Sequence, residues 1–83
     1  MITTEEVMNF LIKAKLIRKD QVLDKNESLI EGGIIDSLGV LEIIGYIENT
    51  YDINIGEEDL VPENFDSLAA IQMFISNRKS LKQ

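Results

Sequence analysis

Cysteine and histidine are both absent from this sequence of 83 residues. Without cysteine, the chain can form neither a disulfide framework nor a thiolate metal site. Without histidine as well, most zinc, iron and copper chemistry is excluded, together with Ser-His-Asp and Cys-His catalysis. The serine, threonine, tyrosine and lysine side chains that are present have no histidine to activate them. We therefore expect no catalytic residues, no bound metal and no enzyme activity.

Long apolar runs are absent too. The longest uninterrupted run is only a few residues, whereas a membrane-spanning helix needs about 20. Residues 1–6 are polar and acidic, where a signal peptide would be basic and then apolar. Apolar residues make up 45% of the sequence, which is enough for one small core. We predict a single domain over residues 1–83, a cytoplasmic location, a monomer and no membrane insertion.

Basic residues are missing from the middle of the chain. The net charge is −7, and no lysine or arginine lies between Asn26 and Asn77, a stretch that holds eleven acidic residues. Such a stretch is either a well-solvated surface or a surface that presents negative charge to a basic partner. We favour the second interpretation. The acidic balance argues against nucleic acid and anionic membranes as partners.

The spacing of apolar residues predicts helices and no strand pair. The first helix should span residues 3–17, because Thr3-x-x-Glu6 fits a capping box and apolar residues follow at helical spacing. A second should run from Asp36 or Ser37 to residues 49–52. A short acidic helical turn over 57–59 should end at Pro62, since proline lacks the amide that continues a helix.

The last helix should run from Asp66 or Ser67, with Asp66 as its cap, through about Arg78. The predicted fold class is therefore all-α: a small four-helix bundle with three main helices and a short third helix. The segment before the second helix carries paired glycines and should be a loop pinned to the core by apolar residues. These are Val22, Leu23, Leu29, Ile30, Ile34 and Ile35.

The second helix has more apolar residues than one buried stripe requires. They are Leu38, Val40, Leu41, Ile43, Ile44, Tyr46 and Ile47. So small a protein can hardly bury a helix on all sides, so the surplus predicts an exposed contact surface. Glu42 and Glu48 must then reach solvent. Gly45 lies in mid-helix at a cost of about 1 kcal/mol relative to alanine, which suggests the close approach of another backbone.

The tripeptide Asp-Ser-Leu occurs twice, at residues 36–38 and 66–68. At a helix start it places a serine hydroxyl where the free amides and the macrodipole favour a phosphate. It can equally be no more than a good helix start, since both Asp and Ser favour that position. The first copy follows a long loop and opens the helix with surplus apolar residues. We therefore select Ser37 as the candidate site and interpret Ser67 as a capping residue.

The chain resembles the acyl carrier proteins, members of the phosphopantetheine-binding superfamily that also includes peptidyl carrier domains. The resemblance covers essentially the whole chain. It is carried by Gly33-Ile34-Ile35-Asp36-Ser37-Leu38, Val40-Leu41-Glu42-Ile43-Ile44, Ile47-Glu48, Tyr51-Asp52-Ile53-Asn54-Ile55, Leu60-Val61 and Asn64-Phe65-Asp66-Ser67-Leu68-Ala69-Ala70-Ile71.

The resemblance implies a carrier without catalysis of its own. Ser37 would carry 4′-phosphopantetheine, transferred from coenzyme A by a phosphopantetheinyl transferase with magnesium, and Asp36 would help to position that metal. The thiol of the arm would hold acyl groups as thioesters. The residues that would face basic docking patches on acyl-transferring and acyl-processing enzymes are Leu38, Leu41, Glu42 and Glu48.

Two glycines depart from the pattern of fatty-acid carriers. Gly39 stands where those carriers usually have an acidic residue, and Gly45 where a bulky residue such as methionine is common. Both reduce the usual recognition surface, which suits a specialised carrier in a dedicated pathway such as polyketide, nonribosomal peptide or modified-lipid synthesis. Two alternatives stay open: a peptidyl or aminoacyl carrier of the nonribosomal type, and an unmodified acidic helical module that only binds a basic partner.

Overall fold

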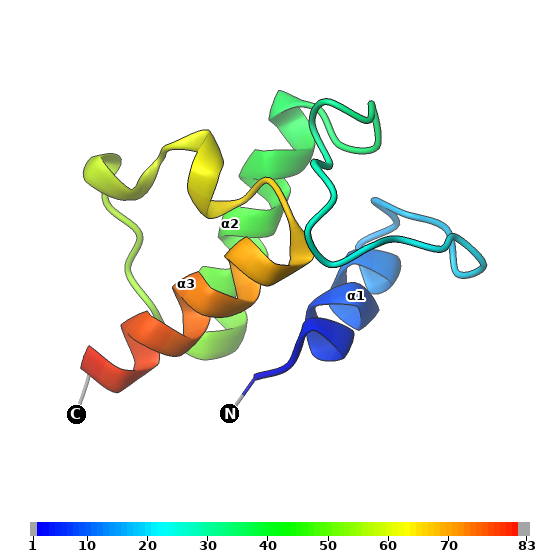
Figure 1. Ribbon diagram of the computed structural model, residues 1–83. Helices are drawn as coiled ribbons and strands as arrows, with labels where there is room; N and C mark the ends of the chain where they lie inside the picture. Colours follow the sequence, from blue (N-terminus) through cyan, green and yellow to red (C-terminus); the bar gives the residue numbers. More distant parts are fainter. Residues whose placement is uncertain (1, 82–83) are drawn as a thin grey trace.

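Three α-helices dominate the computed structural model, which describes residues 2–81, with side chains up to Lys79. They are α1 (Thr4–Lys13), α2 (Ser37–Tyr51) and α3 (Leu68–Leu81). Figure 1 shows α3 crossing α2, with α1 beside them. Residues 2–81 contain no strand, so the predicted all-helical class is confirmed. The helix count is lower than the predicted four.

The short acidic helical turn predicted over 57–59 is present as the 3-10 turn η1 (Glu57–Asp59), and a second 3-10 turn that was not predicted, η2 (Pro62–Asn64), follows it. Each turn has three residues. Pro62 begins the second turn and does not end the first, since a proline's missing amide costs nothing at the first position of a helix. Neither turn contributes a buried residue. The segment is therefore a wall of two tight turns on the side of α2 opposite the long 14–36 segment (Figure 1).

Helix α1 ends four residues earlier than predicted. Its start is as expected, with the Glu6 amide donating to the Thr3 hydroxyl over 3.1 Å. The Glu6 carboxylate, however, accepts a hydrogen bond from Tyr51 Oη of α2 at 2.7 Å and ties the two helices together. At the other end, Lys15 adopts a left-handed conformation with φ of 64°. The Leu16 amide then donates to the Leu11 carbonyl, a Schellman closure that stops the helix.

The long segment between α1 and α2 is anchored to the core, as expected, but by fewer residues. Leu29 and Ile35 are buried, and Leu23 and Ile34 pack against the core. Val22 is 93% exposed and Ile30 39%, so the prediction was wrong for these two. Backbone hydrogen bonds hold the segment to the start of α3. The Leu29 amide donates to the Asp66 carbonyl over 2.7 Å, and the Ala69 amide donates to the Lys25 carbonyl over 2.9 Å.

The core lies where the three helices meet. Helix α2 contributes Gly39, Ile43 and Ile47, spaced four residues apart on one stripe. Helix α3 contributes Leu68, Ile71 and Ile75, and α1 contributes Val7, Phe10 and Leu11. Phe10 also stacks on Tyr46, with ring centroids 4.5 Å apart. None of the described helices is both long enough and apolar enough to cross a membrane.

Candidate functional site

Ser37 is the first residue of α2, and its side chain is exposed. The preceding residue, Asp36, is the N-cap: its backbone is extended, and its Oδ1 accepts a hydrogen bond from the Gly39 amide at 2.9 Å. Asp36 therefore caps the helix, and the Ser37 side chain is not needed as a cap. Within residues 2–81 no group makes a hydrogen bond with the Ser37 hydroxyl. The hydroxyl is thus available for chemistry at the positive end of α2.

Gly39 explains how the loop before Ser37 is held against the helix. It is buried, and a Cβ added to it would lie 2.7 Å from Cγ2 of Ile35, closer than real Cβ atoms come to a neighbour. The absence of a side chain thus lets the buried Ile35 pack directly on the first turn of α2. From the sequence, Gly39 was noted only because fatty-acid carriers usually have an acidic residue at this position. Its role in packing depends on a contact between the loop and the helix, which the sequence alone does not reveal.

An apolar pocket of about 240 Å³ opens beside Ser37. One side is a stripe of α2 on which the serine and three apolar residues follow each other at helical spacing: Ser37, Val40, Leu41 and Ile44. The other side is the wall of turns with its flanking residues, joined by one residue of the long segment. These are Leu60, Val61, Pro62, Phe65 and Ile30. A group attached to Ser37 would therefore lie at the rim of an apolar cavity.

The predicted partner-binding residues fall into two groups. Leu38 is 69% exposed and Leu41 60%, and Glu42 beside them is exposed as well. They form one outward surface next to Ser37, which accounts for the surplus of apolar residues on α2. Glu48 differs, because it is half-buried and its carboxylate accepts a hydrogen bond from the Ile55 amide at 3.1 Å. Glu48 therefore stabilises the segment that follows α2 by bonding to the Ile55 amide. Its role in partner binding stays a prediction.

Gly45 lies further along α2, one turn beyond Leu41. A Cβ added to Gly45 would meet no described atom within 4 Å outside its own helix. No backbone of the described chain approaches it, so the close approach suggested by its mid-helix position does not occur within residues 2–81.

The second Asp-Ser-Leu segment is arranged differently. Here Ser67 is the capping residue, since its hydroxyl accepts a hydrogen bond from the Ala70 amide at 3.1 Å. The prediction that Asp66 caps this helix was wrong. Its carboxylate accepts hydrogen bonds from Ser28 Oγ at 2.8 Å and from the Ile30 amide at 2.9 Å. The Ser67 hydroxyl thus caps its helix, as predicted from the sequence, whereas the Ser37 hydroxyl does not cap α2.

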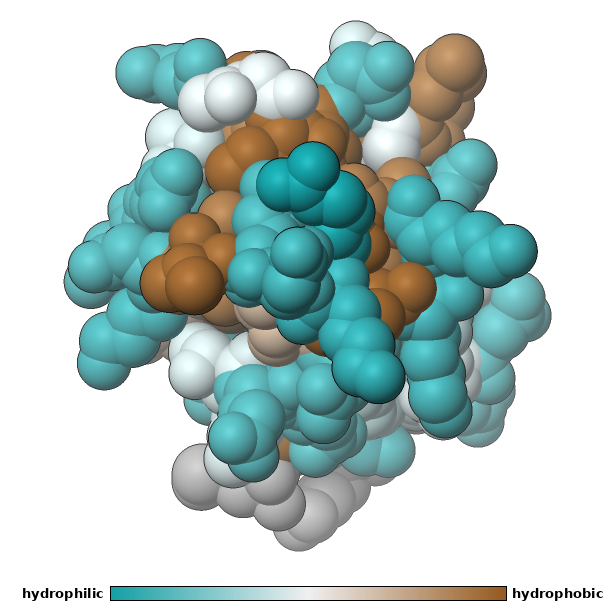
Figure 2. All heavy atoms as spheres, turned by 90° about the vertical axis from the view of Figure 1, so that its right-hand side faces the viewer, coloured by the Kyte–Doolittle hydropathy of each residue, from teal (hydrophilic) through white to brown (hydrophobic). Residues whose placement is uncertain are grey.

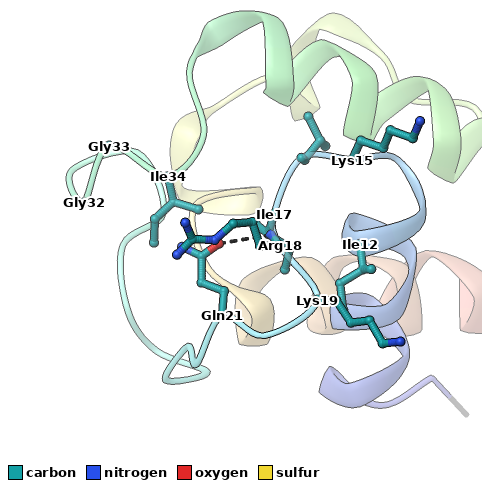
Figure 3. A pocket seen from close by; sticks show the side chains of 10 residues that line it. Ile12, Lys15, Ile17, Arg18, Lys19, Gln21, Gly32, Gly33 and Ile34 are labelled. Carbon is teal, nitrogen blue, oxygen red and sulfur yellow. Dashed lines mark hydrogen bonds between the residues drawn. The ribbon is translucent and has the colours of Figure 1, made fainter.

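A second hollow lies away from Ser37, on the face between the end of α1 and the 32–34 turn. It is an open groove of about 670 Å³ with Lys15, Arg18 and Lys19 at its edges (Figure 3). The two lysine side chains extend away from each other in the close-up, so they do not converge on one point. Figure 2 shows this side of the molecule, where hydrophilic side chains separate small apolar areas. Three basic residues are thus gathered at this groove, and one of them, Arg18, forms an exposed ion pair with Asp20 at 3.6 Å.

Comparison with protein-family models and with curated proteins gives no match to this chain. The functional conclusion consequently depends on the geometry around Ser37.

Among the described residues, no three acidic side chains are grouped closely enough to hold a metal ion.

Proposed function

We propose that this protein is an acyl carrier protein that is modified on Ser37 with 4′-phosphopantetheine. The observation that carries the proposal is the exposed Ser37 hydroxyl, which has no hydrogen-bond partner within the described chain and lies at the rim of an apolar pocket. The arm, once attached, supplies the thiol that this cysteine-free chain lacks and that holds an acyl group as a thioester.

The residues around Ser37 suit such a group. Its phosphate would lie at the N-terminus of α2, where the helix dipole favours an anion. One carboxylate oxygen of Asp36 is engaged by the Gly39 amide, and because the residue is exposed, its other oxygen would be accessible to a metal ion during transfer. The apolar stripe of Val40, Leu41 and Ile44 offers an acyl chain a surface away from water. We assign no particular pathway to the carrier.

Partner enzymes would dock on the surface formed by Leu38, Leu41 and Glu42. An apolar centre beside an exposed carboxylate is a suitable contact for a basic patch with an apolar pocket, because charge guides the encounter and apolar burial retains it. The partners proposed are a phosphopantetheinyl transferase and enzymes that load or process acyl groups. The same surface would also serve the alternative function, an unmodified acidic module that binds a basic protein.

Mass spectrometry of the intact protein separates these functions. The full chain is incubated with coenzyme A, magnesium and a broad-specificity phosphopantetheinyl transferase, alongside the variants Ser37→Ala and Ser67→Ala. We expect wild type and Ser67→Ala to gain one phosphopantetheine and Ser37→Ala to gain none. If wild type gains nothing, the unmodified module becomes the better conclusion. A gain that disappears only in Ser67→Ala would move the site to the second tripeptide.

A further inference from the structure

The wall of the pocket beside Ser37 contains no buried residue within its two turns. Its ends are anchored by Ile53 and Phe65, which are 2% and 1% exposed, but its middle residues Leu60 and Val61 are 47% and 39% exposed. On its outer side, towards α3, lies a third hollow of about 400 Å³, distinct from the groove near Lys15. The wall thus stands between two cavities, and apolar burial alone does not fix its position.

Arg78 of α3 holds this wall by two polar contacts. Its Nη2 forms an ion pair with Asp59 Oδ1 at 2.6 Å, and its Nη1 donates a hydrogen bond to the Asn54 carbonyl at 2.8 Å. Asp59 in turn accepts from the Gly56 amide through Oδ2 at 3.1 Å, and its carbonyl accepts from Asn64 Nδ2 at 2.8 Å. The guanidinium therefore contacts η1 and the chain before it directly, and it is linked to η2 through the hydrogen bond between Asn64 and Asp59. We call this set of contacts the Arg78 clamp.

Aromatic rings connect the Arg78 clamp to the pocket. The guanidinium carbon lies 5.0 Å from the ring centroid of Phe74, a cation–π distance. Phe74 contacts Phe65 with centroids 5.2 Å apart, and Phe65 lines the pocket beside Ser37. The ion pair is partly shielded, with side-chain exposures of 26% for Arg78 and 14% for Asp59. Its hydrogen bond from Arg78 also lowers the pKa of the Asp59 carboxyl, so the carboxylate is charged at neutral pH.

We propose that the Arg78 clamp positions the wall of turns and thereby limits the pocket to a short apolar chain, an inference that rests on the proposed function of Ser37. At about 240 Å³ the pocket is below the roughly 300–1,000 Å³ usual for ligand sites. Release of the wall from α3 would allow Leu60 and Val61 to move away from α2 and admit a longer chain.

The first test uses the unmodified protein and needs no cargo. Amide hydrogen exchange is measured for wild type, Arg78→Gln, Arg78→Lys and the control Lys79→Gln. The control removes the same charge from the neighbouring residue, whose Nζ bonds to the Tyr51 carbonyl at 3.4 Å and not to the wall. We expect Arg78→Gln to raise exchange at Asp59, Leu60 and Asn64 about tenfold, with little change in α1. Arg78→Lys should be intermediate, because an ammonium cannot reproduce the two-pronged contact.

Unchanged exchange at these amides in Arg78→Gln, or an equal rise throughout α1 and α2, would overturn the clamp. An equal effect of Lys79→Gln would also overturn it. These outcomes are independent of whether Ser37 is modified.

The second test uses protein loaded on Ser37 with hexanoyl or dodecanoyl thioesters and measures cleavage by hydroxylamine. In wild type we expect the dodecanoyl thioester to be cleaved several-fold faster than the hexanoyl one, because the longer chain is left in solvent. In Arg78→Gln the ratio should fall towards one, while Lys79→Gln keeps the wild-type ratio. A ratio near one in wild type, or one unchanged by Arg78→Gln, would overturn the limit on cargo length. Failure to load any variant would instead overturn the proposed function, and the exchange measurement would still decide the clamp.

Discussion

The same three residues, Asp-Ser-Leu, begin α2 at 36–38 and α3 at 66–68, yet they occupy different places in the two helices. At α2 the aspartate is the cap, and the serine and leucine are exposed. At α3 the serine is the cap and the leucine is buried, at 4% exposure. The second copy is therefore shifted by one residue relative to its helix.

The shift has a cause in the neighbouring chain. The Asp66 carboxylate is engaged by Ser28 and the Ile30 amide, so the cap of α3 falls to the next polar residue. Within the described part of the chain, no residue outside α2 engages the Asp36 carboxylate, whose Oδ1 caps α2. Once the cap moves by one residue, every following side chain turns by about 100° around the helix. A tripeptide thus specifies that a helix begins there, and tertiary contacts decide which hydroxyl is left free.

The largest expected difference between the two segments is in their leucines. Leu68→Ala should lower the free energy of unfolding by about 3 kcal/mol, because it removes a buried side chain and leaves a cavity. Leu38→Ala should change it by less than about 0.5 kcal/mol, because this side chain is 69% exposed. Urea unfolding followed by circular dichroism measures both. Similar losses for the two variants would show that the leucines are not in the different environments described.

The aspartates should differ in the same direction but by less. Asp66→Ala removes two hydrogen bonds that join the 28–30 turn to the start of α3, and we expect a loss of about 2–3 kcal/mol. Asp36→Ala removes a helix cap and should cost about 1 kcal/mol. The same urea experiment applies, with Ser28→Ala as a comparison that removes one of the two bonds together with the hydrogen bond from the Glu31 amide to Ser28 Oγ. The comparison fails if Asp36→Ala proves the more costly change.

The helices themselves could be predicted from local signals in the sequence. The Thr3 cap, the Asp36 cap and the buried stripes of α2 and α3 follow from residue types and helical spacing. The end of α1 could not, since Lys15 is a lysine in a left-handed position where glycine is the usual signal. The turn at 57–59 was predicted correctly, but the second turn at 62–64 was missed, because Pro62 permits a new turn as readily as it ends one.

The candidate site was predictable only in part. Ser37 was selected by the context of its tripeptide, and the free hydroxyl agrees with that choice. The pocket could not be foreseen, because it forms between α2 and residues 60–65, which are remote in sequence. The same holds for Arg78, whose contacts with Asn54 and Asp59 cross about 20 residues of chain. Contacts between residues so far apart in the sequence produce no local pattern from which they could be predicted.

The serines offer the smallest expected change in stability, and the second segment should again be the more sensitive of the two. Ser67→Ala removes the cap of α3 and should lower the free energy of unfolding by about 1 kcal/mol. Ser37→Ala removes a hydroxyl without a hydrogen bond in the described chain, and alanine favours a helix slightly, so stability should change by less than about 0.5 kcal/mol. Thermal unfolding of the two variants on the unmodified chain measures the difference. A loss near 1 kcal/mol for Ser37→Ala would mean that its hydroxyl helps to hold α2, and the distinction between a structural and a free serine would then no longer separate the two segments.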